Sequence, residues 1–142
     1  MPYRCYVCDQ PFSPPLRTVE LQIRQIIGFA DYGDDDIRLT IGTNTRTELR
    51  HYCSADCRLD DLPSLKAALG LRFSSPHTEP IMACGRCGRP VDGSRAHKSF
   101  LAADLISTEH HWTLLPFKES QFAVLCADCD TDDEIDRLRS CA

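Results

Sequence analysis

Residues 84–90 read Cys84-Gly85-Arg86-Cys87-Gly88-Arg89-Pro90, and residues 5–11 repeat the spacing of the two cysteines as Cys5-Tyr6-Val7-Cys8-Asp9-Gln10-Pro11. Two residues separate the cysteines of each stretch, so a tight turn brings their sulfur atoms close together. The glycine after the second cysteine of residues 84–90 lets the backbone turn back toward the sulfur. Residues 5–11 have no glycine at that position, so we expect their turn to be less regular.

Two further cysteine pairs follow these turns along the chain. One pair closes each half of the sequence, Cys53-x₃-Cys57 in the first and Cys126-x₂-Cys129 in the second. Four cysteine sulfurs make a closed tetrahedral Zn²⁺ site, and in a reducing compartment such a pattern more often binds metal than forms disulfides. The sequence therefore predicts two structural zinc ions, with ligands Cys5, Cys8, Cys53 and Cys57 for the first and Cys84, Cys87, Cys126 and Cys129 for the second.

The sequence leaves the pairing of the sites and the metal open. Local pairing closes shorter loops, but a cross-braced arrangement would join the pair at 5 and 8 to the pair at 84 and 87. Iron in a rubredoxin-like site would use the same ligands as zinc. The ninth cysteine, Cys141, is expected to be a free thiol.

The first half alternates between strand and turn signals before its closing pair. Apolar and polar residues alternate over 19–23 and over 37–41, which predicts two half-buried strands. The acidic loop 31–36 is expected to turn the chain between them. Residues 42–45, with the sequence Gly-Thr-Asn-Thr, predict a further turn before a strand over 47–52 that leads to Cys53.

Leucines at helical spacing follow the first closing pair. Leu59, Leu62, Leu65 and Leu69 share one helical face, and the glycine at position 70 is a candidate C-cap. Pro63 leaves open whether this helix is continuous or restarts with a cap at position 60 or 61.

The second half is a shorter version of the first. Residues 99–106, 111–117 and 121–125 are apolar-rich runs separated by polar turns, and acidic residues after Cys129 suit the start of a brief helix. We therefore predict a small α+β, zinc-stabilised fold with two similar lobes, each made of a knuckle, β-hairpin strands and a short helix. The expected boundaries are 1–72 for the first lobe, 73–80 for an exposed linker with two prolines, and 81–142 for the second lobe.

The order of knuckle, hairpin, cysteine pair and helix resembles the treble-clef and zinc-ribbon groups of zinc fingers. The resemblance rests on the eight ligand positions and covers most of the chain by order of elements, with one extra residue in Cys53-x₃-Cys57. It implies that the last two ligands of each site lie at the first turn of a helix. These groups include proteins that bind proteins, DNA or RNA as well as enzymes, so the resemblance implies no single activity.

The charge of the chain favours a protein partner over a nucleic acid. The formal charge is −5, and two zinc ions on eight thiolates change it by −4, to −9. Phosphate binding normally relies on an excess of Lys and Arg. We expect a protein that acts by protein–protein interaction, as an inhibitor, adaptor, antitoxin or immunity-type protein, and that meets a basic partner surface with the loop 31–36 and Trp112. The alternative is a nucleic-acid-binding regulator that uses the basic residues Arg86, Arg89, Arg95 and Lys98.

Enzymatic chemistry has little support in the sequence. Catalytic zinc keeps an open position for water, whereas four cysteines close the coordination sphere. No P-loop, dinucleotide fingerprint or deaminase motif is present, so we predict no catalytic residues, although an electron carrier or enzyme remains the third class. His51 lies two residues before Cys53 and could replace a ligand, but a role beside the site is favoured. The chain has no apolar run long enough to cross a membrane and no secretory signal, which predicts a cytoplasmic protein.

Overall fold

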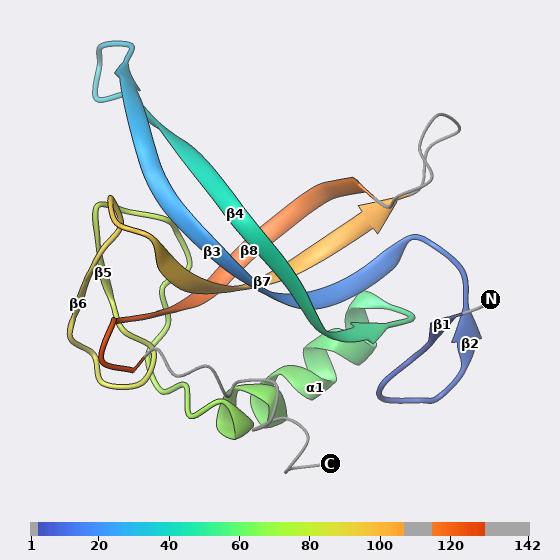
Figure 1. Cartoon of the computed structure of the whole chain (residues 1–142). Helices are drawn as coiled ribbons and strands as arrows, with labels where there is room; N and C mark the ends of the chain where they lie inside the picture. The colour runs from blue at the N-terminus through green and yellow to red at the C-terminus, as the bar shows by residue number, and fades with distance from the viewer. Residues whose placement is uncertain (1–2, 107–114, 130–142) are drawn as a thin grey trace.

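The structure is a computed structural model that describes residues 3–106 and 115–129 of the 142-residue chain. These residues form a mostly β structure with one helix, which is compatible with the expected α+β class (Figure 1). In chain order the elements are β1 (Tyr3–Arg4), β2 (Pro11–Phe12), β3 (Leu16–Asp31), β4 (Ile37–Tyr52), α1 (Ala55–Ala68), β5 (Ile81–Ala83), β6 (Pro90–Asp92), β7 (His97–Ile106) and β8 (Leu115–Leu125). Trp112, Cys141 and the helix expected after Cys129 lie outside the described residues.

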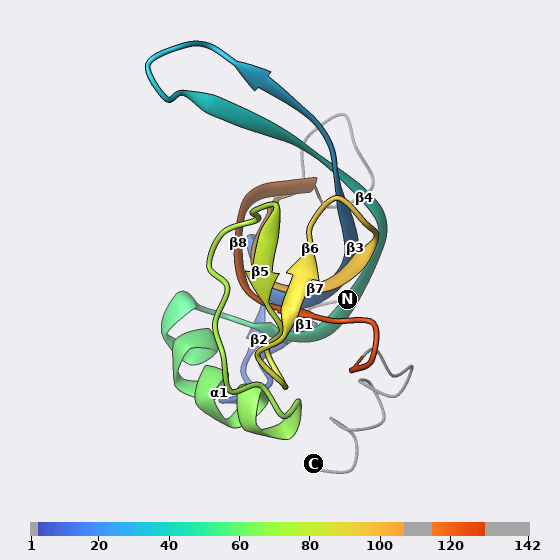
Figure 2. The ribbon, with the colours of Figure 1, turned by 90° about the vertical axis from the view of Figure 1, so that its left-hand side faces the viewer.

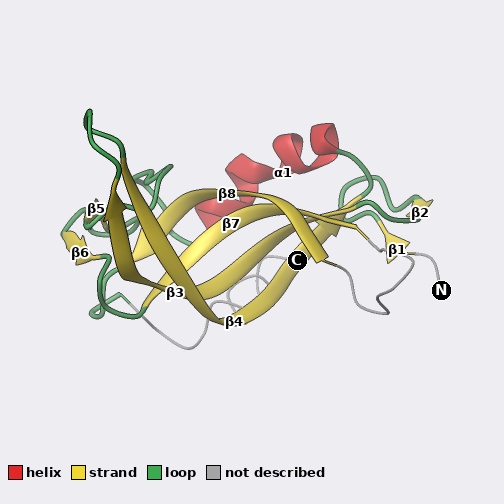
Figure 3. Ribbon diagram, turned by 90° about the horizontal axis from the view of Figure 1, so that it is seen from above, coloured by secondary structure: helices red, strands yellow, loops and turns green. Residues whose placement is uncertain are grey.

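One four-stranded antiparallel sheet joins the two halves of the sequence. Its order is β4-β3-β7-β8, so each half contributes one hairpin and the two central strands pair with each other (Figure 3). The β3–β7 register runs from Leu16 opposite Leu105 to Arg24 opposite His97. Two short ribbons, β1–β2 and β5–β6, carry the first two cysteines of each half.

The apolar core lies between this sheet and α1. It contains fully buried side chains from the sheet and from the helix, among them Val19, Phe100, Leu65 and Leu69. The helix begins after Ser54, whose hydroxyl accepts a hydrogen bond from the Cys57 backbone at 3.1 Å. Gly70, the predicted C-cap residue, follows the last turn with a φ of 72°, and the backbone N–H groups of Gly70 and Leu71 bond back to Ala67 and Lys66.

The helix is continuous through Pro63, so the possibility of a restart at residue 60 or 61 is wrong. Proline removes one intrahelical hydrogen bond. The turns on either side are anchored to the sheet, because Asp61 bonds to Arg50 and Tyr52 and Leu65 lies in the core. These contacts hold the helix across the missing bond.

Two of the predicted turns are wrong because the chain stays in the sheet there. Residues 42–45 lie inside β4, where Thr43 pairs with Arg24 and Thr45 with Ile23, leaving Asn44 as an extra residue in a bulge. The polar residues 118–120, expected to separate two short runs, lie within β8 opposite residues 102–104 of β7. A long partner strand offers hydrogen bonds throughout, so these polar residues stay in the sheet, and the pairing register shifts instead of a turn forming.

The expected linker 73–80 contains no helix or strand, but it is not a free connector. Most of its side chains are exposed, while Ser75 is buried, its backbone N–H bonding to the Phe122 carbonyl at 3.0 Å and its hydroxyl to the Ala83 carbonyl at 3.0 Å. The segment therefore packs against β5 and β8.

The far end of the β3–β4 hairpin, residues 27–40, projects from the rest of the molecule and is called the arm below (Figures 1 and 2). Its base is fixed where the Ile26 backbone N–H bonds to the Gly93 carbonyl at 2.7 Å. The sheet itself is strongly curved, so that β8 and the β3–β4 hairpin rise on opposite sides of its concave face, which is called the trough below (Figure 2). No helix among the described residues has the length and apolar character needed to span a membrane.

Candidate metal centres

The structure brings the eight paired cysteines together in two groups of four. In each group all four sulfur atoms lie within 4.8 Å of one another. A tetrahedral site with Zn–S bonds of about 2.3 Å requires sulfur atoms about 3.8 Å apart. The separations of 3.6 Å for Cys8–Cys53, 3.8 Å for Cys53–Cys57 and 3.6 Å for Cys87–Cys126 match this value. Each group can therefore hold a zinc ion.

Each group contains cysteines from one half of the chain only, which is the local pairing predicted from the shorter loops that it closes. One group consists of Cys5, Cys8, Cys53 and Cys57, and the other of Cys84, Cys87, Cys126 and Cys129. The cross-braced alternative is wrong, because no sulfur atom of the first half lies in the group of the second.

The two cysteine knuckles have the same backbone geometry, so the expectation of a less regular first knuckle is wrong. The Cys5 N–H bonds to the Gln10 carbonyl at 3.0 Å, and the equivalent Cys84 N–H bonds to the Arg89 carbonyl at 2.8 Å. Asp9 adopts a left-handed φ of 57° where Gly88 has 74°. An aspartate tolerates this conformation better than most residues, and it replaces the glycine in the first knuckle.

The closing pairs are positioned by the ends of the long strands. Cys53 follows β4 directly, and Cys57 lies in the first turn of α1, which Ser54 caps. Cys126 follows β8, and the Cys129 N–H bonds back to the Cys126 carbonyl at 3.1 Å. The second knuckle is tied to β8, since the Gly85 N–H bonds to the Val124 carbonyl at 2.7 Å.

One buried cysteine in each group is predisposed to ionise. Burial raises the pKa of Cys5, but backbone N–H groups of residues 8, 53 and 7 together lower it to about 6. Burial likewise raises the pKa of Cys84, and backbone N–H groups of residues 126, 87 and 86 bring it to about 6. Thiolate is the form that binds metal, so each knuckle supplies one ligand that is largely ionised at neutral pH.

The pKa values of Cys53 and Cys129 shift in the opposite direction. Hydrogen bonding with Cys8 and then burial raise the pKa of Cys53 to about 12, and burial with hydrogen bonding to neighbouring sulfurs raises that of Cys129 to about 12. Four thiolates at these separations repel one another. A divalent cation at the centre removes this penalty and allows all four sulfurs to ionise.

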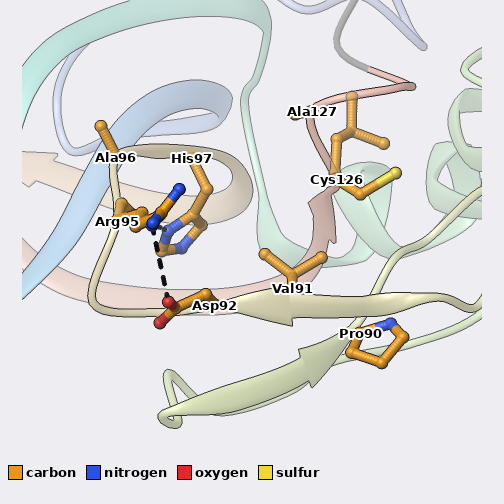
Figure 4. A pocket seen from close by; sticks show the side chains of 9 residues that line it. Pro90, Val91, Asp92, Arg95, Ala96, His97, Cys126 and Ala127 are labelled. Atoms are coloured by element: carbon orange, nitrogen blue, oxygen red, sulfur yellow. Dashed lines mark hydrogen bonds and ion pairs between the residues drawn. The ribbon is translucent and has the colours of Figure 1, made fainter.

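Nearby groups that could compete as ligands point elsewhere. The His51 ring accompanies Glu48, with Nδ1 3.2 Å from a carboxylate oxygen, and it does not belong to the first cysteine group. A hollow of about 240 Å³ borders the second group and contains Asp92, Arg95 and His97. Figure 4 shows the Cys126 sulfur directed away from Asp92 and His97. The cysteines alone form each metal-binding cluster among the described residues.

Two arginines hold the centres in place in a way that the sequence did not predict. Arg58, next to Cys57, reaches the Ala103 carbonyl at 3.0 Å and Asp104 at 2.9 Å, which ties the start of α1 to β7. Arg86, inside the second knuckle, donates to the Leu69 carbonyl at 2.8 Å and to the Cys129 carbonyl at 2.7 Å. Arginines at such positions look like ordinary surface residues until the partner strands are known.

In comparisons with known proteins, no family model, no curated protein and no solved structure matches this chain.

Proposed function

We propose that this chain is a non-enzymatic protein-binding module in which two structural zinc ions hold a rigid scaffold and the arm makes the contact. The observation that carries the proposal is the concentration of large exposed apolar side chains on the arm. Ile27, Phe29, Tyr32 and Ile37 are each more than half exposed, and Phe29 reaches 73 %. A projecting cluster of this kind is typical of a protein-binding surface.

The register places part of this cluster on one face of the arm. Phe29 lies opposite Leu39 and Asp31 opposite Ile37, and side chains two residues apart on a strand share a face. Burial of a Phe or Ile side chain contributes about 1.5–3 kcal/mol. Phe29 and Ile37 share this face and are 73 % and 58 % exposed, so a partner that covers both gains about 2–4 kcal/mol. The arm therefore offers an apolar anchor, and the rest of the contact must come from surrounding residues.

The turn of the arm adds negative charge beside the apolar face. Residues 31–38 include four aspartates and one arginine, a net charge of −3. Arg38 is engaged with Asp36 at 3.4 Å and with the Tyr32 ring at 4.7 Å, while Asp34 and Asp35 are exposed. These charges favour a partner with a basic rim around an apolar surface, and such complementarity speeds association at low salt.

Support for nucleic-acid binding is weaker, because the basic stretch is engaged within the protein. Arg86 bonds to backbone carbonyls on both sides of the second knuckle. Arg89 lies 3.4 Å from Asp128 and Arg95 lies 3.8 Å from Asp92. These acidic neighbours reduce the positive potential that a phosphate backbone requires.

The sharpest test places a photo-crosslinking amino acid at Phe29 in the chain expressed in its own cells. We expect one protein to crosslink there and not at Leu59, which is 67 % exposed on α1 and serves as the matched control. The double variant Phe29→Ser and Ile37→Ser should weaken binding to that protein by about 30-fold or more, as loss of a central contact does. Leu59→Ser should leave binding unchanged.

Zinc content measured on each variant shows that the scaffold is intact. Crosslinks to nucleic acid, or equal crosslinking at both positions, would contradict the proposed role of the arm. Retained affinity in the double variant would also contradict it.

We further infer that each centre is of the treble-clef kind, with a zinc knuckle that supplies its first two ligands. The chain would then comprise a lobe over 1–72, a connector over 73–80 and a lobe over 81–142. The repeated hydrogen bonds of the two knuckles support this division. The lobes would be fused through β3–β7 pairing. Eight thiols kept available for metal favour a reducing compartment, the cytoplasm.

A further inference from the structure

The face of the sheet that lines the trough is largely buried, and it carries a group of polar side chains beside the apolar Leu101 and Ala103. Glu20, Gln22, Ser99 and Gln121 on this face are each less than one-tenth exposed. Gln22 is directly opposite Ser99, and Arg24 directly opposite His97, so these side chains lie on the same face of β3 and β7. This is the face that α1 does not cover.

The two edges of the sheet meet across the trough. Arg46 on β4 contacts Glu119 on β8 at 2.9 Å and Glu20 on β3 at 2.7 Å, and the Gln22 amide donates to Glu119 at 3.2 Å. In a flat sheet three steps between strands would separate β4 from β8 by about 14 Å. The curl of the sheet therefore encloses the polar face.

A hollow of about 450 Å³ opens at one end of this trough. It is lined by Arg24 from β3, Ile41 from β4, the connector residues Pro76, His77 and Thr78, and residues 119–121 of β8. This volume lies in the range of sites for small molecules.

Arg24 is the cation of this hollow that lacks a carboxylate partner. No carboxylate among the described residues lies within ion-pair distance of its guanidinium, which donates to the Thr78 hydroxyl at 3.5 Å. The Thr78 hydroxyl gives its proton to Gln121 at 3.1 Å, so it can accept from Arg24. Glu119 is already held by Arg46 and Gln22. Burial lowers the pKa of Arg24, while the charge of Glu119 opposes this shift and that of Arg46 adds to it.

Unpartnered polar atoms gather beside Arg24. Among the described residues, the buried side-chain atoms that have no hydrogen-bond partner are Gln22 Oε1, Arg24 Nε, His97 Nε2 and Ser99 Oγ. All four lie on the trough face of β3 and β7. Buried polar atoms without a partner are rare and costly in native proteins. Of these four residues Arg24 lines the 450 Å³ hollow, whereas His97 borders the hollow beside the second cysteine group, so Arg24 is the member of the cluster that a ligand in the larger hollow would meet.

We propose that the hollow binds a small organic acid, whose carboxylate is held by Arg24 and whose apolar body packs against Ile41 and Pro76. A planar guanidinium matches the two oxygens of a carboxylate. The site is independent of the arm, so its failure would leave the protein-binding proposal untouched.

Three probes separate the chemical requirements in an NMR titration of the zinc-loaded protein. Benzoate has both a carboxylate and an apolar body, inorganic phosphate has the charge alone, and benzamide has the body alone. We expect saturable shifts of the Arg24 side chain and the Thr78 amide with benzoate, and binding at least about tenfold weaker with the other two. No saturable shifts with benzoate, or equal binding of benzamide, would overturn the proposal. Tighter binding of phosphate would also overturn the organic-acid assignment.

Substitutions at position 24 test the contact directly. Arg24→Gln should abolish benzoate binding. Arg24→Lys should weaken it by about tenfold, because a lysine cannot make the bidentate contact of a guanidinium with a carboxylate. Arg38→Gln, which removes an arginine from the arm, is the charge-matched control and should bind normally. Unchanged binding in Arg24→Gln would refute the assignment.

A second measurement shows whether Arg24 is instead a structural residue. Arg24→Met keeps most of the side-chain volume, and without ligand it should keep or raise the urea midpoint, because it removes a poorly compensated buried charge. A clear fall in the midpoint, with no benzoate binding in the parent protein, would show that Arg24 serves the fold alone.

Discussion

Replacement of Asp61 by alanine should destabilise the protein more than any neighbouring surface change on α1. Asp61 accepts hydrogen bonds from the Tyr52 hydroxyl at 2.6 Å and from Arg50 at 2.9 Å, and all three residues are buried. Removing the carboxylate leaves a buried guanidinium without its counter-ion and a buried hydroxyl without its acceptor. Breaking a buried pair in this way costs about 3–5 kcal/mol. This is a large part of the unfolding free energy of a small domain, which is about 5–15 kcal/mol.

The assay is urea unfolding of the zinc-loaded protein, with the midpoint and the slope both recorded. Asp60→Ala is the matched control, since Asp60 is the exposed neighbour on the same helix, and it should change stability by no more than about 0.5 kcal/mol. Tyr52→Phe should cost about 1.5–3 kcal/mol, because it removes one hydrogen bond to a charged acceptor. If Asp61→Ala were no more destabilising than Asp60→Ala, the argument that this buried network anchors α1 to β4 would be refuted.

Two other predictions concern the second half of the chain. Cys87→Ser should release one zinc ion and abolish the protection of β5–β6 backbone amides from hydrogen exchange. The control, Cys141→Ser, should retain both ions. If Cys87→Ser retained two zinc ions, Cys87 would not be a ligand. Burial lowers the pKa of His97 despite the opposing hydrogen bond to the Arg95 carbonyl, so the ring should titrate by NMR below the usual value of about 6.5. In this pH range the folded state binds fewer protons at His97 than the unfolded state does. The contribution of His97 to stability is therefore present above a pH of about 6.5 and is lost as the pH falls below it. A pKa for His97 at or above about 6.5 would show that the ring is not desolvated.

The cysteine spacing predicted the metal centres because the ligands of each centre are fixed by short local geometry. Two residues between cysteines determine a knuckle, and the closing cysteine pair of each half completes the four ligands. The helix end at Gly70 was also predicted correctly, because the C-cap of a helix depends on neighbouring residues in the sequence. The left-handed Asp9 was missed because an aspartate adopts this conformation only occasionally; here its backbone N–H bonds to the Cys5 carbonyl at 2.9 Å, as that of Gly88 does to Cys84.

Features that depend on distant parts of the chain could not be predicted from the sequence. Glu20, Gln22 and Arg24 alternate with apolar residues and therefore resemble the solvent face of a strand. They are buried or half-buried because the sheet curls until Arg46 meets Glu119, residues far apart in the sequence. The turn expected at 42–45 was wrong for a related reason, since β3 is long enough to pair with the whole of β4.

The zinc content of the protein is measured by native mass spectrometry with elemental analysis on the chain purified from its own cells. We expect two zinc ions per chain, both retained after the bound partner is stripped and one lost for each cysteine group that is disrupted by a Cys→Ser change. Iron in place of zinc, or a folded chain that carries fewer than two metal ions, would contradict the claim that two four-cysteine zinc centres organise this fold.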